Sequence, residues 1–388
     1  MRKISNLSGK KKKITIFSIS TIISLLIVEA FVRYYYSEKN NSHLNSSPNY
    51  DKSCGYYDKD EYYGKFDNVS RMKFYSKAGY RPMPMWNGRG VFNNELGLRT
   101  KRSTSEINEV KDGVTLVSGG STAFGAGVKQ NDVFTNYMES TFTAGVGGYV
   151  FANEFSFLRE VVGPKVNFNT WVSFSGWNDV YCAYKGYDYY LSPDMFQLKQ
   201  VIYSSKFNSY WPKIDPKRVY EDYDFKLLWL LGKAFDRYVF NSRTGFDEID
   251  GEETKMRYED FWGMLSNEIA IASKWASASG RNFIYILQPS LYATRKKLSK
   301  NELCILNNNK KMHPKMVDYF EKTYKFIRRD IEDLSKKEKF VFLDSDLALE
   351  GLDSDVTIFV DHVHLGSKGN EALGKWMKKQ MHPMKGLN

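Results

Sequence analysis

Three regions far apart in the chain carry side chains that could serve one reaction. Ser121 follows two glycines in Gly-Gly-Ser-Thr (119–122), where a sharp turn could expose its hydroxyl beside the N–H groups of a following helix. Asn178 stands in Gly-Trp-Asn-Asp (176–179), and an amide at the end of a strand could donate a hydrogen bond to an oxyanion. Asp361 precedes His364 by three residues, so its carboxylate could orient the imidazole that a serine nucleophile needs as its base.

Each of these regions also has a structural interpretation, which is the more common one when the region is taken alone. A Gly-Gly-Ser turn can simply reverse the chain, Asn178 can cap a helix, and Asp361 and His364 can form a solvated pair before a helix. The combination in this order is more specific than any of its parts.

In chain order, Ser121, the glycine-rich AGVGGY (144–149), Gly176-x-Asn178 and Asp361-x-x-His364 resemble the motif blocks of the SGNH hydrolase superfamily, also called GDSL esterases and lipases. The resemblance covers about residues 113–377 in blocks. It implies Ser121 as the nucleophile, His364 as the general base and Asp361 as the residue that orients it. It also implies an oxyanion hole made by the backbone N–H groups of Ser121 and Gly148 and by the side chain of Asn178. No metal or organic cofactor is implied.

The chain departs from that pattern in four places. The stretch between Ser121 and AGVGGY is short, so the helix and the second-strand region there are expected to be trimmed or irregular. GGST stands where the family has a GDS-type block, so the aspartate of that block is absent, and Thr143 stands where members often have Asn. A second imidazole, His362, precedes His364; we prefer His364 as the base because it has the DxxH spacing. NNELGLR (93–99), LQP (287–289) and a glutamate near the end of an apolar N-terminal segment are similar to features of membrane-anchored bacterial members.

Strands alternate with helices after residue 113, which predicts an α/β class with a parallel sheet covered on both faces. The resemblance narrows this to a three-layer α/β/α, flavodoxin-like fold, with ligand sites at the carboxyl ends of the strands. Expected strands are 114–117, 168–174, 282–287 and 340–343, and expected helices are 132–140, 151–162, 258–278, 314–334 and 366–380.

The N-terminal sequence predicts a membrane signal anchor. A basic tail (1–13) carries six of the positive charges and precedes an apolar segment (14–32) of 19 residues, long enough to cross a bilayer as a helix of roughly 29 Å. The basic flank predicts a cytoplasmic N-terminus and an extracytoplasmic remainder on a single-pass anchor in the cell membrane. A cleaved signal peptide is the alternative, and it also gives a translocated domain.

The expected domain organisation continues with a polar linker (33–70), an N-terminal extension (71–112) and the hydrolase-like domain (113–380). An aromatic-rich, mostly helical insertion is expected at about 181–256. Without the basic tail, the formal net charge of +11 falls to +5, so the composition gives no support to nucleic-acid binding.

The cysteines and histidines are few. Three cysteines and five histidines exclude a disulfide scaffold and leave little for a metal cluster. Cys182 and Cys304 could pair in an oxidising compartment, but we expect at least two of the three cysteines (Cys54, Cys182 and Cys304) to be ordinary small hydrophobes.

The expected function is that of a serine-dependent carboxylester hydrolase outside the cytoplasmic membrane. Aromatic residues in the insertion could stack on sugar rings, which suggests O-acetyl groups of a glycan as substrate, although such residues more often fill cores. Two alternatives remain. One is an O-acyltransferase with the same triad and a glycan hydroxyl as acceptor, and the other is a non-catalytic anchored protein of glycan assembly.

Overall fold

A computed structural model describes the part of the chain that carries the candidate residues. The described residues are Cys54, 72–75, 79–82, 84–85, 87–88, 91–186 and 255–381. The expected basic tail (1–13), the anchor (14–32), the linker except Cys54, and the insertion from residue 187 to residue 254 lie outside them. None of the helices in the described ranges is long and apolar enough to cross a membrane.

The centre of the fold is a parallel sheet of five strands. Its spatial order is β6-β5-β7-β8-β9, and every neighbouring pair is parallel. This is the 2-1-3-4-5 order of flavodoxin-like sheets, as expected. The strands are β5 (Thr115–Gly119), β6 (Thr141–Gly145), β7 (Thr170–Ser175), β8 (Asn282–Leu287) and β9 (Val341–Asp344).

The central strands are apolar on both faces because helices cover both faces. Leu116 and Trp171 point into one hydrophobic core, and their successors Val117 and Val172 point into a second core on the other side. A strand that is buried on both faces has a nearly continuous apolar sequence. The two central strands β5 and β7 could therefore be predicted from the sequence.

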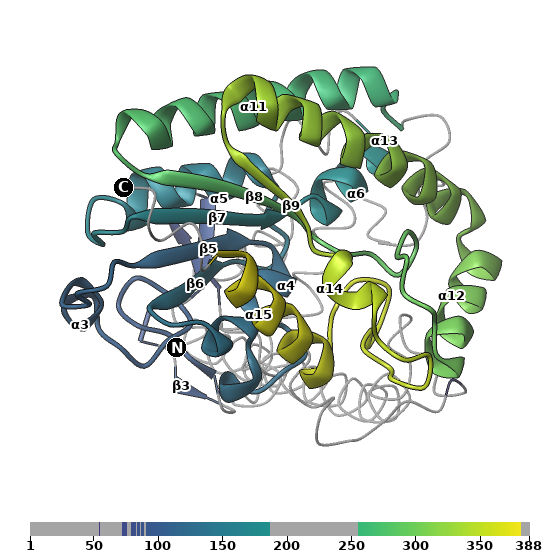
Figure 1. The fold of residues 1–388 in the computed structure, drawn as a ribbon, viewed down its shortest axis with the longest axis horizontal. Coiled ribbons are helices and arrows are strands. Elements are labelled where there is room, and N and C mark those ends of the chain that lie inside the picture. Colours follow the sequence, from purple (N-terminus) through teal and green to yellow (C-terminus); the bar gives the residue numbers. More distant parts are fainter. Residues whose placement is uncertain are drawn as a thin grey trace, which may run out of the picture. The chain divides into compact units, whose positions relative to one another are not determined.

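Two layers of helices enclose the sheet (Figure 1). One layer supplies the first core, and the other packs on the opposite face with the second core. The first layer contains α5 (Phe151–Phe157, continued by a π turn over Leu158–Val162), α6 (Trp177–Lys185), α11 (Tyr258–Ala278) and α13 (Pro314–Glu338). The second contains α4 (Ser121–Phe124), α14 (Leu347–Glu350) and α15 (Ser367–Met381).

The expected helix over 132–140 is wrong. The chain forms two 3₁₀ turns there, Gln130–Asp132 and Phe134–Tyr137, and then enters strand β6, which the sequence did not reveal. Helix α12 (Lys300–Met312) was also missed. Its polar, asparagine-containing sequence has no clear apolar stripe, and a capping box at Ser299 and Glu302 starts it instead.

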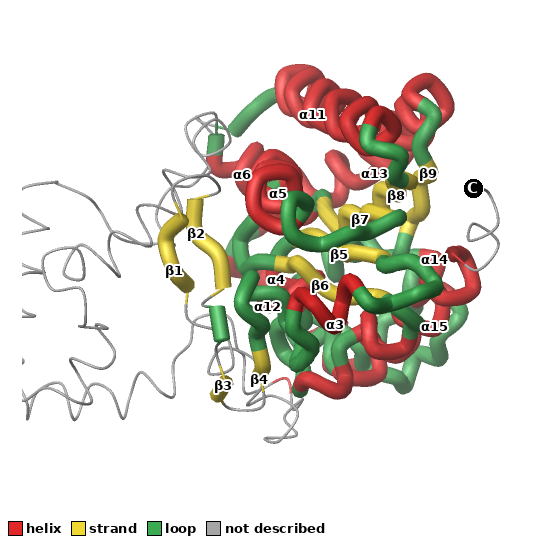
Figure 2. The backbone as a smooth tube through the Cα atoms, turned by 90° about the vertical axis from the view of Figure 1, so that its left-hand side faces the viewer, coloured by secondary structure: helices red, strands yellow, loops and turns green. Residues whose placement is uncertain are grey.

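Residues of the N-terminal extension pack in the same core as the sheet. Leu98 and Ile107 are fully buried in the first hydrophobic core. The strands of this extension form two antiparallel pairs, and Figure 2 labels its short strands and its helix. They are β1 (Met72–Tyr75) with β2 (Gly79–Pro82), β3 (Asn87–Gly88) with β4 (Val91–Phe92), and α3 (Thr104–Asn108).

The two ends of the insertion meet at helix α6. This helix extends through Lys185, past the expected start of the insertion at about residue 181. The backbone N–H of Met256 donates to the carbonyl of Ala183 at 2.9 Å. The described residues on the two sides of the insertion are therefore neighbours, and the sheet order is not interrupted.

The cysteine expectations are wrong. Cys54 and Cys304 form a disulfide across 250 residues, so two of the three cysteines are bonded. Cys182 is buried and is not in a disulfide, which excludes a Cys182–Cys304 pair. The bond joins the expected linker to helix α12.

Candidate active site

Ser121 lies where the sheet topology places ligand sites. The chain passes from β5 to β6 on one side of β5 and then to β7 on the other side, so the carboxyl ends of β5 and β7 border the switch point of the sheet. Ser121 follows β5 as the first residue of the one-turn helix α4, and Asn178 follows β7 near the start of α6. Two of the three sequence regions therefore meet because of strand order.

The third region completes a hydrogen-bonded chain of three side chains. His364 Nε2 lies 2.7 Å from Ser121 Oγ, and His364 Nδ1 lies 2.7 Å from Asp361 Oδ2. A carboxylate only accepts hydrogen bonds, so Nδ1 carries the proton and Nε2 is left to accept the serine proton. The structure brings together the three residues that the resemblance named as nucleophile, base and orienting acid.

Backbone donors fix the carboxylate of Asp361. Its Oδ1 accepts the N–H groups of Val363 and His364 at 2.8 and 2.6 Å, which leaves Oδ2 for the imidazole. Asp361 is 3% exposed and His364 is 7% exposed. This shielding from water strengthens the contact between the two side chains.

The segment that carries Asp361 and His364 is a closed loop. Val360 N–H donates to the carbonyl of His364, and Gly366 N–H donates to that of Ile358. The carboxylate of Glu302 on α12 also anchors this loop, because it accepts hydrogen bonds from the N–H groups of Ile358 and Phe359 at 2.9 and 3.1 Å. Glu302 is in turn paired at 2.8 Å with Lys296, and both side chains are fully buried.

The Asn178 amide contacts a residue next to each of the other two oxyanion candidates. Its Nδ2 donates to the carbonyl of Tyr149 at 2.7 Å, directly after Gly148. The same atom lies so close to Gly120 that a Cβ at position 120 would overlap it, so only glycine fits before Ser121. Within the described residues, no acceptor takes the backbone N–H of Ser121. The amide thus contacts both the Ser121 turn and the Gly148 loop.

His362 is not part of the hydrogen-bonded chain. Its ring stacks on Tyr292 with centroids 5.6 Å apart and packs against Trp177 at 5.1 Å. Its backbone carbonyl accepts the N–H of Leu291 at 3.1 Å. These contacts attach the His364 loop to the loop that follows β8 and to the residue next to Asn178.

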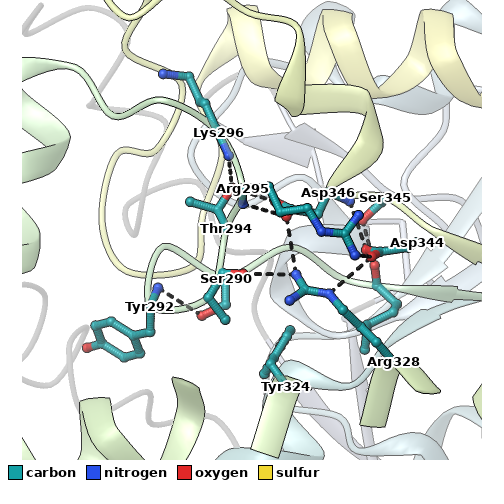
Figure 3. A network of polar contacts seen from close by, with 12 residues as sticks. Ser290, Tyr292, Thr294, Arg295, Lys296, Tyr324, Arg328, Asp344, Ser345 and Asp346 are labelled. Carbon is teal, nitrogen blue, oxygen red and sulfur yellow. Dashed lines mark hydrogen bonds and ion pairs between the residues drawn. The ribbon is translucent and has the colours of Figure 1, made fainter. Parts of the chain in front are cut away.

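The loop after β8 is anchored by a polar network at the end of β9 (Figure 3). Arg328 donates to Asp344 at 3.0 Å and to Asp346 at 3.2 Å. Asp346 also accepts the hydroxyl of Thr294 and the N–H of Arg295. At the start of the same loop, Gln288 Nε2 donates to Thr122 Oγ1 at 2.8 Å, beside the candidate nucleophile, so the loop contacts both halves of the site.

Two buried carboxyl groups near the site were missed by the sequence analysis. Asp179 Oδ1 accepts the N–H of Phe151 at 3.0 Å, and Glu154 Oε2 accepts the hydroxyls of Ser118 and Ser173. Burial raises the pKa of Asp179 to about 6 and that of Glu154 to about 8. Asp179 ties the start of α6 to the start of α5, which follows the Gly148 loop. The sequence FANEFSF (151–157) did indicate a buried carboxyl group, because Glu154 lies on the apolar face of an expected helix.

The described residues contain no candidate metal-binding site. Across the described ranges, no group of three or more His, Cys, Asp or Glu side chains is arranged to hold a metal ion. The reacting groups that the site offers are the hydroxyl, the imidazole and the amide.

Comparison with known proteins finds similarity at the level of solved structures only. No protein-family profile and no curated protein sequence matches the chain. A GDSL-like lipase from Bacteroides thetaiotaomicron is 13% identical with a TM-score of 0.38, covering 71% of this chain and 92% of its own. An acetyl xylan esterase from Geobacillus stearothermophilus is 10% identical with a TM-score of 0.36, covering 69% and 94%. Similarity at this level says nothing of the substrate.

Proposed function

We propose that the protein is a serine-dependent carboxylester hydrolase of the SGNH type. The observation that carries the proposal is the continuous hydrogen-bonded chain from Ser121 Oγ through His364 to Asp361, beside the amide of Asn178. Ser, His and Asp in this geometry are recognised by their roles and contacts, whatever the fold.

The reaction follows from the direction of each hydrogen bond. Ser121 Oγ attacks the carbonyl carbon of the ester, and its proton passes to His364 Nε2. The oxyanion is stabilised by the N–H groups of Ser121 and Gly148 and by Asn178 Nδ2. His364 then returns the proton to the leaving alcohol oxygen as the ester C–O bond breaks and an acyl-serine remains. Water attacks that acyl group, giving its proton to His364, and the carboxylic acid leaves as Ser121 regains a proton.

The location and the substrate class belong to the same proposal. An apolar segment after a basic tail supports a single-pass anchor with the hydrolase domain outside the cytoplasmic membrane. The Cys54–Cys304 disulfide supports this placement, because such bonds persist in oxidising compartments. For a tethered domain we propose small acyl groups, O-acetyl groups above all, on an extracytoplasmic glycan.

Labelling with a fluorophosphonate, mapped to a peptide, tests the nucleophile without knowledge of the substrate. We expect the full chain in detergent to be labelled at Ser121 and S121A to remain unlabelled. The two neighbouring histidines provide a matched pair, since H364N should lose the labelling and H362N should keep most of it. An unlabelled wild-type protein with the same circular dichroism as S121A would refute the esterase proposal.

Acyl transfer is separated from hydrolysis by the products. With p-nitrophenyl acetate as donor and excess acceptor sugar, a hydrolase releases free acetate as its main product. Acetylated sugar in excess over acetate would instead assign the same triad to an O-acyltransferase.

A further inference from the structure

The N-terminal extension places a buried cation against the turn that carries Ser121. Arg99 is only 4% exposed. Its guanidinium donates through Nη1 to the carbonyls of Phe124 and Gly125 at 2.9 and 2.6 Å and through Nη2 to that of Val128 at 2.8 Å. All three acceptors lie within seven residues of the candidate nucleophile.

Within the described part of the chain, no carboxylate forms an ion pair with Arg99. Its remaining polar contact is Nε to Gln130 Oε1 at 3.2 Å, and its guanidinium also lies over the ring of Phe124 at 5.0 Å. Burial lowers the pKa of Arg99 to about 9, and the negative charge of Asp132 opposes this shift. Arg99 is therefore charged at neutral pH, with carbonyl dipoles in place of water. A charge is buried in this way only where its hydrogen bonds are nearly complete.

The helix that starts at Ser121 needs such external support. Helix α4 has four residues, and a single turn is not stable by itself because the cost of nucleation is not repaid. Its last carbonyls have no partner within the helix. The carbonyl of Ala123 accepts the hydroxyl of Thr143 at 2.6 Å, and the carbonyls of Phe124 and Gly125 accept the planar fork of Arg99. Gly125 is left-handed with φ of 81°, and a Cβ there would lie 2.9 Å from Arg99 Nη1.

The carbonyls held by Arg99 are connected to both partners of the Ser121–His364 contact. Ala126 N–H donates to the carbonyl of Ser121 at 2.8 Å. The turn that Arg99 holds is therefore hydrogen-bonded to the nucleophile residue itself. A Cβ at Gly127 would lie 3.7 Å from the carbonyl of Leu365, so the same turn abuts the loop that carries His364.

We propose that Arg99 is a positioning residue that fixes Ser121 Oγ against His364 Nε2 by holding the carbonyl end of the nucleophile turn. The inference rests on the proposed function for its effect on catalysis. It makes the N-terminal extension a part of the catalytic assembly, and it assigns a role to the last residue of NNELGLR. Arg99 touches neither substrate nor reacting atoms.

The test compares R99K and R99M with R102K as matched control. Lysine keeps the charge but cannot present a planar fork to three carbonyls, and Arg102 is an exposed arginine three residues further on. We expect R99K to lower kcat and the rate of fluorophosphonate labelling by about tenfold to a hundredfold, with KM within about twofold. R99M should lose at least as much, while R102K should match the wild type. All rates are expressed per folded molecule.

Hydrogen exchange gives a readout that does not depend on activity. In R99K, the amides of residues 124–128 should exchange faster than in the wild type, while the strands of the sheet keep their protection. If R99K matched R102K in both exchange and kcat, or lost thermal stability with kcat per folded molecule unchanged, the positioning role would be refuted. An unlabelled wild-type protein would refute the esterase proposal instead, and the exchange comparison would still decide whether Arg99 holds the turn.

Discussion

Replacing Glu154 by glutamine tests the buried polar layer between the sheet and α5. The side chain of Glu154 is fully buried. Its Oε2 accepts two serine hydroxyls at 2.9–3.0 Å, and its Oε1 has no hydrogen-bond partner among the described residues. Burial is the main cause that raises the pKa of Glu154 from 4.5 to about 8, and the charge of Asp179 adds to the shift. Glutamine has the same shape and keeps an acceptor for the two serines, but it cannot ionise.

The direction in which stability changes with pH follows from the number of protons bound in the native and unfolded states. Between about pH 4.5 and about pH 8, the unfolded chain has lost the Glu154 proton while the native state keeps it, so native stability falls as pH rises. The difference between a pKa of 4.5 and one of about 8, at about 1.36 kcal/mol for each unit of pKa, sets a ceiling of roughly 5 kcal/mol. We therefore expect E154Q to gain a few kcal/mol over the wild type by about pH 8 and almost nothing below about pH 4.5.

Other titrating groups face the same layer. Burial also raises the pKa of Asp179 to about 6 and that of Glu268 to about 8, and it raises that of Tyr285 well above its usual value. These groups are present in both proteins, so most of their contribution cancels in the difference between wild type and E154Q.

Urea unfolding followed by circular dichroism, from about pH 5 to about pH 8, measures that difference. Glu160, which is partly exposed in the π turn that follows α5, provides the control E160Q, whose difference from wild type should stay flat. A difference between E154Q and wild type that does not change with pH would mean that Glu154 is ionised in the native state, and would refute the argument.

Three further substitutions probe the site and its supports. N178A should lower kcat about a hundredfold or more with KM little changed, measured with p-nitrophenyl acetate, since one oxyanion donor contributes about 2.7–4 kcal/mol; a loss under about threefold would remove Asn178 from the oxyanion hole. K296M should destabilise the fold by about 3–5 kcal/mol, because it leaves the carboxylate of Glu302 buried without a cation; recovery in K296M/E302Q, followed by urea unfolding, checks the cause. C304S should lower the unfolding free energy by up to about 5 kcal/mol for a 250-residue separation; C54S should give the same loss, and the double variant no more.

Some elements could be predicted because their local patterns agree with their burial. The expected helix 258–278 and strand 282–287 match α11 and β8 in both bounds. Strand β6 was missed because Thr-Phe-Thr-Ala-Gly is short and half polar. Residues 132–140 were misread because 3₁₀ turns and a helix share the same short-range apolar spacing.

The site also contains residues that could be predicted from the sequence and residues that could not. The positions of Ser121, Asn178 and the Asp361–His364 pair could be expected from motif order and strand topology. The residues that hold them, such as Arg99 and Glu302, could not, because charged side chains are expected at the surface unless they are paired. Their burial depends on partners 25 and 56 residues away. The Cys54–Cys304 bond left no trace in the sequence, since its two ends are 250 residues apart.

The disulfide changes what a protease can release. Any single cut between Cys54 and Cys304 leaves two polypeptides that are still covalently joined, so a nick between Cys54 and strand β5 detaches nothing until a reductant is added. A mechanical load applied at the N-terminus would likewise reach helix α12 through the sulfur bridge and bypass the strands. Release of the sheet by a cut between Cys54 and β5 therefore requires two separate chemical events, one on the backbone and one on the disulfide.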